Sequence, residues 1–122
     1  MTWLAVSIAL LAATAQAATP AVSAGEHFSL SLARDGTVRT WGDDTNGQLG
    51  VGRRLAASTP LAVNGLNGFT QVSAGSGFTL ALRSDGTVWS WGQRTSLGYE
   101  TAYAQSSPRR VPGLTGVIAV SA

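Results

Sequence analysis

The chain has 122 residues, a formal net charge of +2 and no cysteine. This length corresponds to one domain or part of one, and the absence of cysteine excludes disulfide bonds and thiol chemistry. All eight basic residues are arginine, and so small an excess of charge argues against a strongly basic nucleic-acid-binding surface.

The first segment in chain order is apolar and uncharged. Residues 2–19 contain an apolar stretch, Trp3 to Ala13, followed by the small-x-small pattern Ala15-Gln16-Ala17. This combination is typical of a secretory signal peptide, although its only positive charge is the amino terminus. It is shorter than the roughly 20 apolar residues of a membrane span. We therefore expect residues 1–17 to be a signal peptide and the protein to be exported to the periplasm, the cell surface or the medium. The alternative is an apolar first strand, although alanine is a poor strand former.

The remainder, residues 18–122, is nearly the same sequence twice. Val22-Ser23-Ala24-Gly25 returns 50 residues later at Val72, and Val120-Ser121-Ala122 begins a third copy after 48 more. A fixed period of this length is the signature of a repeat architecture. The chain divides into repeat one (22–71), repeat two (72–119) and the start of repeat three (120–122).

Each repeat predicts short strands. Residues 28–32 alternate apolar and hydroxyl side chains, and residues 37–41 are rich in β-branched and aromatic types. Asp35-Gly36 between them predicts a hairpin with a type I′ turn, and Asp85-Gly86 does so in the second copy. Residues 60–63 and 69–74 supply two more strands. About four strands per repeat predict an all-β fold made of β-propeller blades.

Two blades are too few for a closed ring, because a propeller needs at least about 4. The chain is therefore expected to be an N-terminal fragment of a longer propeller whose remaining blades complete it. The alternative is a two-repeat protomer that closes the ring by self-association.

The repeats resemble the regulator of chromosome condensation repeat. The resemblance rests on Trp41-Gly42 and on Asn46-Gly47-Gln48-Leu49-Gly50 at matching offsets, and it covers residues 22–122. The positions of the repeat motif are Gly25, His27, Asp35, Gly36, Trp41, Gly42, Gly47 and Gly50, then Gly75, Asp85, Gly86, Trp91, Gly92 and Gly98. The second copy departs from the pattern with Gly77 in the histidine position and with Arg94 to Gly98 as its loop.

This resemblance implies a seven-bladed β-propeller. The best-known activity of the family is nucleotide exchange on a small nuclear GTPase, combined with chromatin binding. No residue of this chain can be matched to that activity, and fold alone does not carry function.

The sequence contains no recognisable catalytic, metal or cofactor site. His27 is the single histidine, and a repeated motif position favours a hydrogen bond within its own blade over chemistry. The chain has no Gly-x-Ser-x-Gly turn and no phosphate-binding loop. Asp43 to Gly47 is rich in oxygen ligands but lacks the spacing of a calcium loop. We predict no cofactor and no enzyme activity.

The residues that the repeats do not share are the candidates for binding. They are Trp89, whose counterpart is Arg39, together with Arg94, Tyr99 and Tyr103 in the variant loop. Trp is enriched in binding hot spots. A partly buried position beside Trp91 is an equally favoured interpretation of Trp89.

The two arginine pairs, Arg53-Arg54 and Arg109-Arg110, occupy non-equivalent repeat positions. They are interpreted as solvated loop charge rather than as a nucleic-acid site. We therefore expect no nucleic-acid partner and no membrane span.

These features predict a non-enzymatic propeller that binds a protein or a surface ligand through variable loops. One alternative is a nucleotide-exchange regulator or chromatin-associated protein. Others are an accessory propeller of a larger secreted enzyme and an enzyme inhibitor, since the architecture is similar to that of secreted bacterial propellers that cover β-lactamases with loop aromatics.

Overall fold

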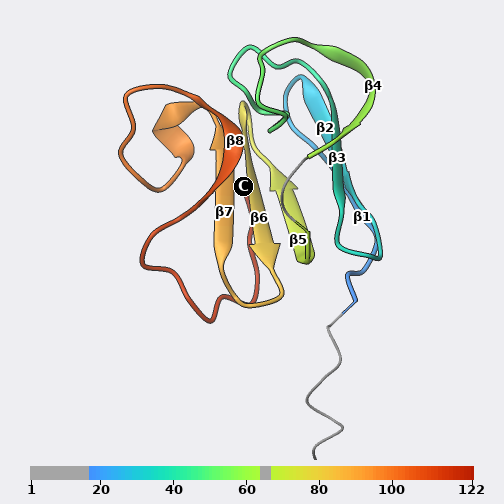
Figure 1. Ribbon diagram of the computed structural model, residues 1–122, viewed down its shortest axis with the longest axis vertical. Coiled ribbons are helices and arrows are strands. Elements are labelled where there is room, and N and C mark those ends of the chain that lie inside the picture. Colours follow the sequence, from blue (N-terminus) through green and yellow to red (C-terminus); the bar gives the residue numbers. More distant parts are fainter. Residues whose placement is uncertain (1–16, 64–66) are drawn as a thin grey trace, which may run out of the picture.

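A computed structural model describes residues 17–63 and 67–122, so the predicted signal peptide lies outside the described residues except for its last position. The described residues form two four-stranded antiparallel sheets, in the orders β1-β2-β3-β4 and β5-β6-β7-β8 (Figure 1). The elements are β1 (Ala21–Ala24), β2 (Phe28–Leu32), β3 (Val38–Gly42), β4 (Ala57–Ala62), β5 (Phe69–Ala74), β6 (Phe78–Arg83), β7 (Val88–Gly92), the 3-10 helix η2 (Arg94–Ser96) and β8 (Gln105–Arg110). The predicted all-β architecture is confirmed. The described part of the chain has no helix long and apolar enough to cross a membrane.

The central hairpin of each sheet forms from the alternating segments of the sequence. β2 buries Phe28, Leu30 and Leu32 on one face and pairs with β3, and β6 pairs with β7 in the same register. Residues 69–74 form a strand as predicted, but this strand opens the second sheet rather than completing the first. The first sheet instead begins with β1, so each blade starts on the segment that ends in Val-Ser-Ala.

The turn between β2 and β3 is not the predicted type I′ turn. Gly36 donates its N–H to the carbonyl of Ala33 at 2.9 Å and has a φ of +83°, whereas no described non-glycine residue has a positive φ. The loop is therefore a type I turn followed by a left-handed glycine, which spares Asp35 an unfavourable conformation. Asp35 Oδ1 instead accepts the hydroxyl of Thr37 at 2.7 Å and its N–H at 3.1 Å. These bonds, the hydroxyl above all, lower the pKa of Asp35.

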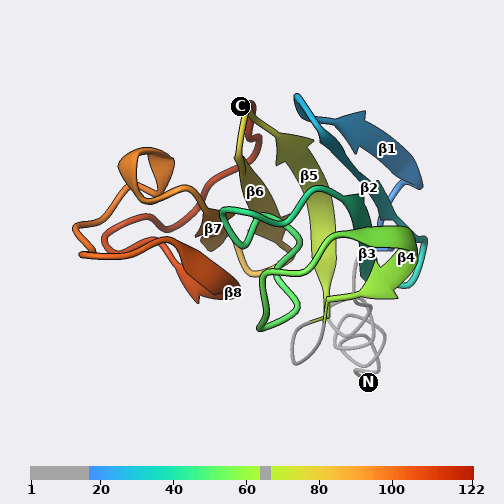
Figure 2. The same ribbon diagram turned by 90° about the horizontal axis from the view of Figure 1, so that it is seen from above.

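The two blades pack against each other through apolar side chains. One cluster joins Leu32, Val38 and Val63 of the first blade to Phe69, Ala81 and Trp91 of the second. Figure 2 shows β5 beside β1 and β2, which is the side of the second sheet that meets the first. The rings of Phe69 and Trp91 are 6.5 Å apart. Full burial of one such large side chain contributes roughly 1.5–3 kcal/mol.

The link between one blade and the next follows a repeated pattern. The N–H of Phe69 donates to the carbonyl of Gly36 at 3.2 Å, and the N–H of Val117 donates to the carbonyl of Gly86 at 3.1 Å. In both cases the incoming chain docks on the hairpin turn of the preceding blade. Residues 117–122 therefore approach the second blade as β5 approaches the first.

Two serine hydroxyls extend this pattern. Ser23 Oγ accepts the N–H of Ala74 at 3.0 Å, and Ser73 Oγ accepts the N–H of Ala122 at 2.9 Å. The equivalent serine in each blade thus holds the first strand of the next unit. The geometry repeats although residues 117–122 carry no sheet of their own.

Each blade has one face that is less covered by described residues than the equivalent face of the other blade. Trp91 is completely buried between the blades, whereas its counterpart Trp41 is only partly buried. On the other blade, Phe78 and Leu80 are partly exposed, while their counterparts in β2 are buried. The two open faces therefore match the two sides of the observed junction.

Candidate functional site: the loops at one end of the blades

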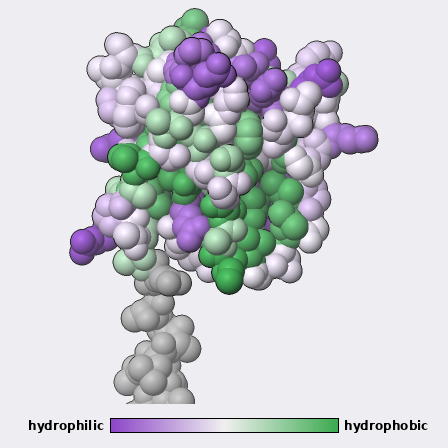
Figure 3. Space-filling model, turned by 180° about the vertical axis from the view of Figure 1, so that it is seen from behind, coloured by the Kyte–Doolittle hydropathy of each residue, from purple (hydrophilic) through white to green (hydrophobic). Residues whose placement is uncertain are grey.

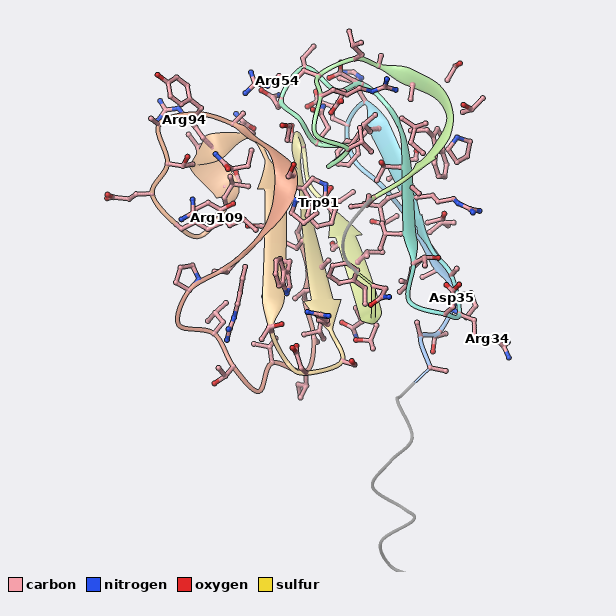
Figure 4. The ribbon with its side chains drawn as sticks, in the orientation of Figure 1. Arg34, Asp35, Arg54, Trp91, Arg94 and Arg109 are labelled. Atoms are coloured by element: carbon pink, nitrogen blue, oxygen red, sulfur yellow. The ribbon has the colours of Figure 1, made fainter. Side chains whose placement is uncertain are left out.

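The residues that differ most between the repeats lie in two loops at one end of the molecule. We call them the first loop (43–56), between β3 and β4, and the second loop (93–104), between β7 and β8. Figure 4 shows Arg54 and Arg94 at this end and Arg34 at the opposite end, where the hairpin turns lie. Figure 3 shows hydrophilic residues gathered at the loop end. The candidate site is built from these two loops.

Side chains within the first loop hold its backbone in place. Gln48 Nε2 donates to Asp43 Oδ2 at 2.9 Å, and Gln48 Oε1 accepts the N–H of Asn46 at 2.8 Å. The hydroxyl of Thr45 donates to the same carboxylate at 2.8 Å and is the main reason that the pKa of Asp43 is lowered. The Asp43 carboxylate and the Gln48 amide oxygen thus serve internal hydrogen bonds of the loop.

Asp44, the second residue of the first loop, has a buried side chain. Its Oδ1 accepts the N–H of Leu49 at 3.0 Å, whereas its buried Oδ2 has no hydrogen-bond partner among the described residues. Burial raises the pKa of Asp44, and the nearby Asp43 carboxylate adds to the rise. The carbonyl of Leu49 accepts the hydroxyl of Thr40 at 2.7 Å, so Asp44 helps to tie the loop to β3.

Tyr99 anchors the second loop. Counted from the shared tryptophan to the shared leucine, this loop is two residues shorter than the first. The hydroxyl of Tyr99 donates to the carbonyl of Ser90 at 3.4 Å, and the guanidinium of Arg109 lies 4.6 Å from the centre of the Tyr99 ring. Burial raises the pKa of Tyr99. Tyr99 therefore fixes the loop to β7 and β8.

The tip of the second loop presents Tyr103 on a braced backbone. Gln105 Nε2 donates to the hydroxyl of Thr101 at 2.9 Å and to the carbonyl of Tyr103 at 3.0 Å. The hydroxyl of Thr101 donates to the same carbonyl at 3.1 Å. The side chain of Tyr103 takes no part in these hydrogen bonds, and the residue is 76% exposed.

The first loop is also held against the second blade. The indole N–H of Trp91 and the hydroxyl of Thr79 both donate to the carbonyl of Gln48, at 2.9 Å and 3.2 Å. The N–H of Gly52 donates to the carbonyl of Ser106 at 2.7 Å. These bonds fix the first loop against β6, β7 and β8 of the second blade.

A shallow hollow opens where the two loops meet. Asn46 and Arg54 of the first loop and Gln93, Arg94, Ala102 and Tyr103 of the second line it. Arg54 Nη2 crosses the boundary and donates to the carbonyl of Ala104 at 3.1 Å. Side chains from both blades therefore form one surface, which we call the junction hollow.

Comparison with known proteins identifies the repeats. Residues 35–82 match the family model of the Regulator of chromosome condensation (RCC1) repeat, and a second model of the same description matches residues 21–48 and 69–96. The chain belongs to the RCC1-repeat family. No curated protein sequence matches it.

Solved structures of longer proteins share the fold of this chain. Human WBSCR16 is 27% identical with a TM-score of 0.64, over 76% of this chain and 25% of its own. Yeast RCC1 (Prp20) with Kap60 bound is 24% identical with a TM-score of 0.70, over 84% of this chain and 26% of its own. Prp20p from Saccharomyces cerevisiae, reported with its binding properties to Gsp1p and histones, has the same identity and TM-score over 79% and 26%. The chain thus spans about a quarter of the length of these structures.

The structure gathers three of the four predicted binding residues. Arg94, Tyr99 and Tyr103 all belong to the second loop, and Arg94 lines the hollows on both sides of it. Trp89 lies elsewhere, in β7, where it packs partly buried against the core between the RCC1-type blades. Its indole N–H donates to the hydroxyl of Thr87 at 3.0 Å.

The RCC1 motif histidine acts through its backbone. The His27 side chain is 73% exposed, and its Nε2 lies 3.7 Å from Glu26 Oε1. The expected hydrogen bond from its ring to the blade is not found among the described residues. The carbonyl of His27 instead accepts the N–H of Asp43 at 2.9 Å, and the carbonyl of Gly77 accepts that of Gln93 at 2.8 Å. This equivalence explains why glycine can replace histidine in the second repeat.

The structure corrects one placement and adds one residue. Arg109 and Arg110, expected in a loop, are the last two residues of β8 and pair with β7. β8 is the outermost strand, so its mostly polar sequence lacks apolar alternation and tolerates Pro108. Gln93 is an additional candidate residue. The sequence contains an indication of it, because the two repeats differ at this position. Within residues 17–63 and 67–122, no three histidine or acidic side chains gather as a metal site.

Proposed function

We propose that this chain is a non-enzymatic RCC1-type scaffold that binds a protein partner through its two end loops. The proposal rests on where the structure places the residues that the two repeats share and those that they do not share. The shared Trp91 is buried in the blade junction, whereas the unshared Arg94 and Tyr103 are exposed on one end. Repeat proteins use such variable side chains on a constant framework for recognition, and Tyr and Arg are enriched in binding hot spots.

The similarity to yeast RCC1 supports a protein as the class of partner. That protein is described in complex with Kap60 and with binding properties to Gsp1p and histones. Because this chain spans only about a quarter of those structures, the proposal extends to the class of partner and to none of these individual proteins.

Site-specific crosslinking tests this function. A photoreactive phenylalanine analogue in place of Tyr103 should yield a discrete crosslinked protein in the cells that make this chain. The same analogue in place of Arg34, exposed at the opposite end, serves as the control. Equal products from both positions, or none from position 103, would contradict the proposal. Accelerated release of guanine nucleotide from a small GTPase would favour the exchange-factor alternative.

We also propose that the protein is exported, with cleavage after Ala17. The apolar stretch and the small-x-small pattern support this proposal. Amino-terminal sequencing of the protein from an extracellular or periplasmic fraction should begin at Ala18. An uncleaved chain confined to the cytoplasm would contradict export.

Finally, we propose that further blades of a longer propeller cover the two open blade faces. The complementary exposure of Trp41 on one face and of Phe78 and Leu80 on the other supports this arrangement. Sequencing of the gene beyond codon 122 and light scattering of its product should show a monomer with additional repeats. A stop codon at that point, with a multimer in solution, would support ring closure by copies of this chain instead.

A further inference from the structure

We infer that the junction hollow binds a carboxylate-rich segment of the partner protein, with Arg54 and Arg94 as its anchoring groups. This inference rests on the proposed function and supplies the chemistry of recognition. It follows from the charges, the neutral donors and the rigidity of the hollow.

Neither arginine lies within salt-bridge distance of an acidic side chain in the described structure. Both are exposed, and of the five N–H donors of a guanidinium Arg54 uses one, on a backbone carbonyl. Arg94 makes no side-chain hydrogen bond to a described residue. Glu100 lines the neighbouring hollow, which Arg94 also lines, but the two side chains form no salt bridge in the described structure. The junction hollow therefore presents two guanidinium groups, which bind carboxylates in paired hydrogen bonds.

Two amide side chains add neutral donors to the hollow. A Cβ atom at Gly77 would lie 3.1 Å from Asn46 Nδ2 and 3.3 Å from Gln93 Oε1, so both amides pack over this glycine. The glycine in place of the motif histidine thus leaves room for the amides between the two blades. Asn and Gln can each donate two hydrogen bonds to a carboxylate.

The hollow is largely organised before a partner arrives. The bonds from Gln105 and Thr101 fix the backbone that carries Tyr103, and the Arg54 bond to Ala104 fixes one loop against the other. Preorganisation lowers the entropy cost of binding. The exposed Tyr103 ring supplies rigid contact area beside the charges.

A peptide fits these observations better than a nucleic acid. Nucleic-acid sites neutralise a run of phosphates and need a clustered basic face. The junction hollow has two arginines on a chain of net charge +2. Two guanidinium groups with the exposed Tyr103 ring in the same hollow suit a short acidic segment.

Fluorescence anisotropy of a labelled glutamate-rich peptide, measured with the full-length protein, tests the inference. Arg94→Gln should weaken binding about 3- to 10-fold, and Arg94→Lys, which keeps the charge without the planar fork, should weaken it less. Raising the salt concentration from about 50 to 300 mM should weaken binding further, because exposed charges are screened. The matched control Arg34→Gln, at the opposite end, should leave the affinity unchanged within about 1.5-fold.

Arg54→Gln should also weaken binding, but it removes the bond to Ala104, so Arg94→Gln is the deciding variant. A thermal melt of each variant separates loss of binding from loss of folding. Equal binding of the peptide with glutamine in place of glutamate would overturn the inference. So would tighter binding of a thymidine hexanucleotide, or an affinity that Arg94→Gln leaves unchanged. Crosslinks at position 103 without binding of the acidic peptide would refute this inference and leave the proposed function standing.

Discussion

The indole N–H of Trp91 donates to the backbone carbonyl of Gln48 at 2.9 Å, across the boundary between two blades. The donor comes from the third strand of one blade and the acceptor from the loop that follows the third strand of its neighbour. Trp41 holds the same position in the first blade, but it is only partly buried and its indole donates to no described residue. The bond therefore distinguishes a covered blade face from an open one.

Trp91→Phe should lower the free energy of unfolding by about 2 kcal/mol, because it leaves a small cavity and removes a buried hydrogen bond. Measured in the 122-residue chain alone, where no further blade covers the first one, Trp41→Phe is the matched control and should cost less than about 1 kcal/mol, since the side chain is only partly buried there. Urea unfolding measures both. Equal losses would mean that the first blade's open face is covered in solution.

Gly50→Ala should destabilise the junction more than Gly52→Ala. Both glycines have positive φ, +71° and +80°, so both substitutions carry a left-handed penalty of about 1–2 kcal/mol. A Cβ at Gly50 would also lie 2.6 Å from Nε1 of Trp91, whereas at Gly52 the nearest atom is 3.8 Å away. Overpacking should add about 1–3 kcal/mol at Gly50 alone. Denaturation midpoints that shift equally would contradict the close approach.

Asp44→Asn should remove a pH dependence of stability. Burial raises the pKa of Asp44, so the folded state keeps this proton to a higher pH than the unfolded state does. The contribution of this group to stability therefore falls as pH rises from the usual aspartate value through the raised one. As the pH rises from 3 to 7, the variant should become more stable relative to the parent, because only the parent loses this contribution. The gain is about 1.4 kcal/mol for every tenfold increase in the proton affinity of Asp44 on folding.

Asp43→Asn gives the control of opposite sign. The pKa of Asp43 is lowered, so its contribution to stability is present near neutral pH and is lost as pH falls through the lowered value. Urea unfolding at a series of pH values follows both variants. A difference between Asp44→Asn and the parent that stays constant with pH would refute the assignment.

His27→Ala should change the free energy of unfolding by less than about 0.5 kcal/mol. The ring is exposed, and the blade uses only the backbone carbonyl of this residue. Thermal melting provides the measurement. A loss above about 1 kcal/mol would show that the ring holds the blade after all.

The strands and the blade type could be predicted because both depend on short sequence patterns within each repeat. Residues 28–32 and 69–74 become strands because alternation and β-branched content act within a few residues of chain. The predicted turn at Gly36 is wrong in type, because Asp-Gly serves two hairpin geometries that differ in which residue must be left-handed. The strand at Phe69 belongs to the second sheet rather than the first, since strand pairing is decided by contacts beyond the segment itself.

The candidate site could be predicted only in part. Comparison of the repeats singles out Arg94, Tyr99 and Tyr103, which the structure places in one loop. It also singles out Trp89, which the structure places in the blade junction. The contribution of Arg54 could not be predicted, because its contact with Ala104 crosses between loops that lie 50 residues apart in sequence.

The docking of residues 117–122 bears on what sets the orientation of one blade relative to the next. This segment takes its place through the carbonyl of Gly86 and the hydroxyl of Ser73, and it forms no sheet among the described residues. A folded blade therefore presents a backbone carbonyl and a serine hydroxyl that set how the following segment is rotated against it. These groups belong to the hairpin turn and the first strand, so the second loop can be two residues shorter while both blades keep the same docking contacts.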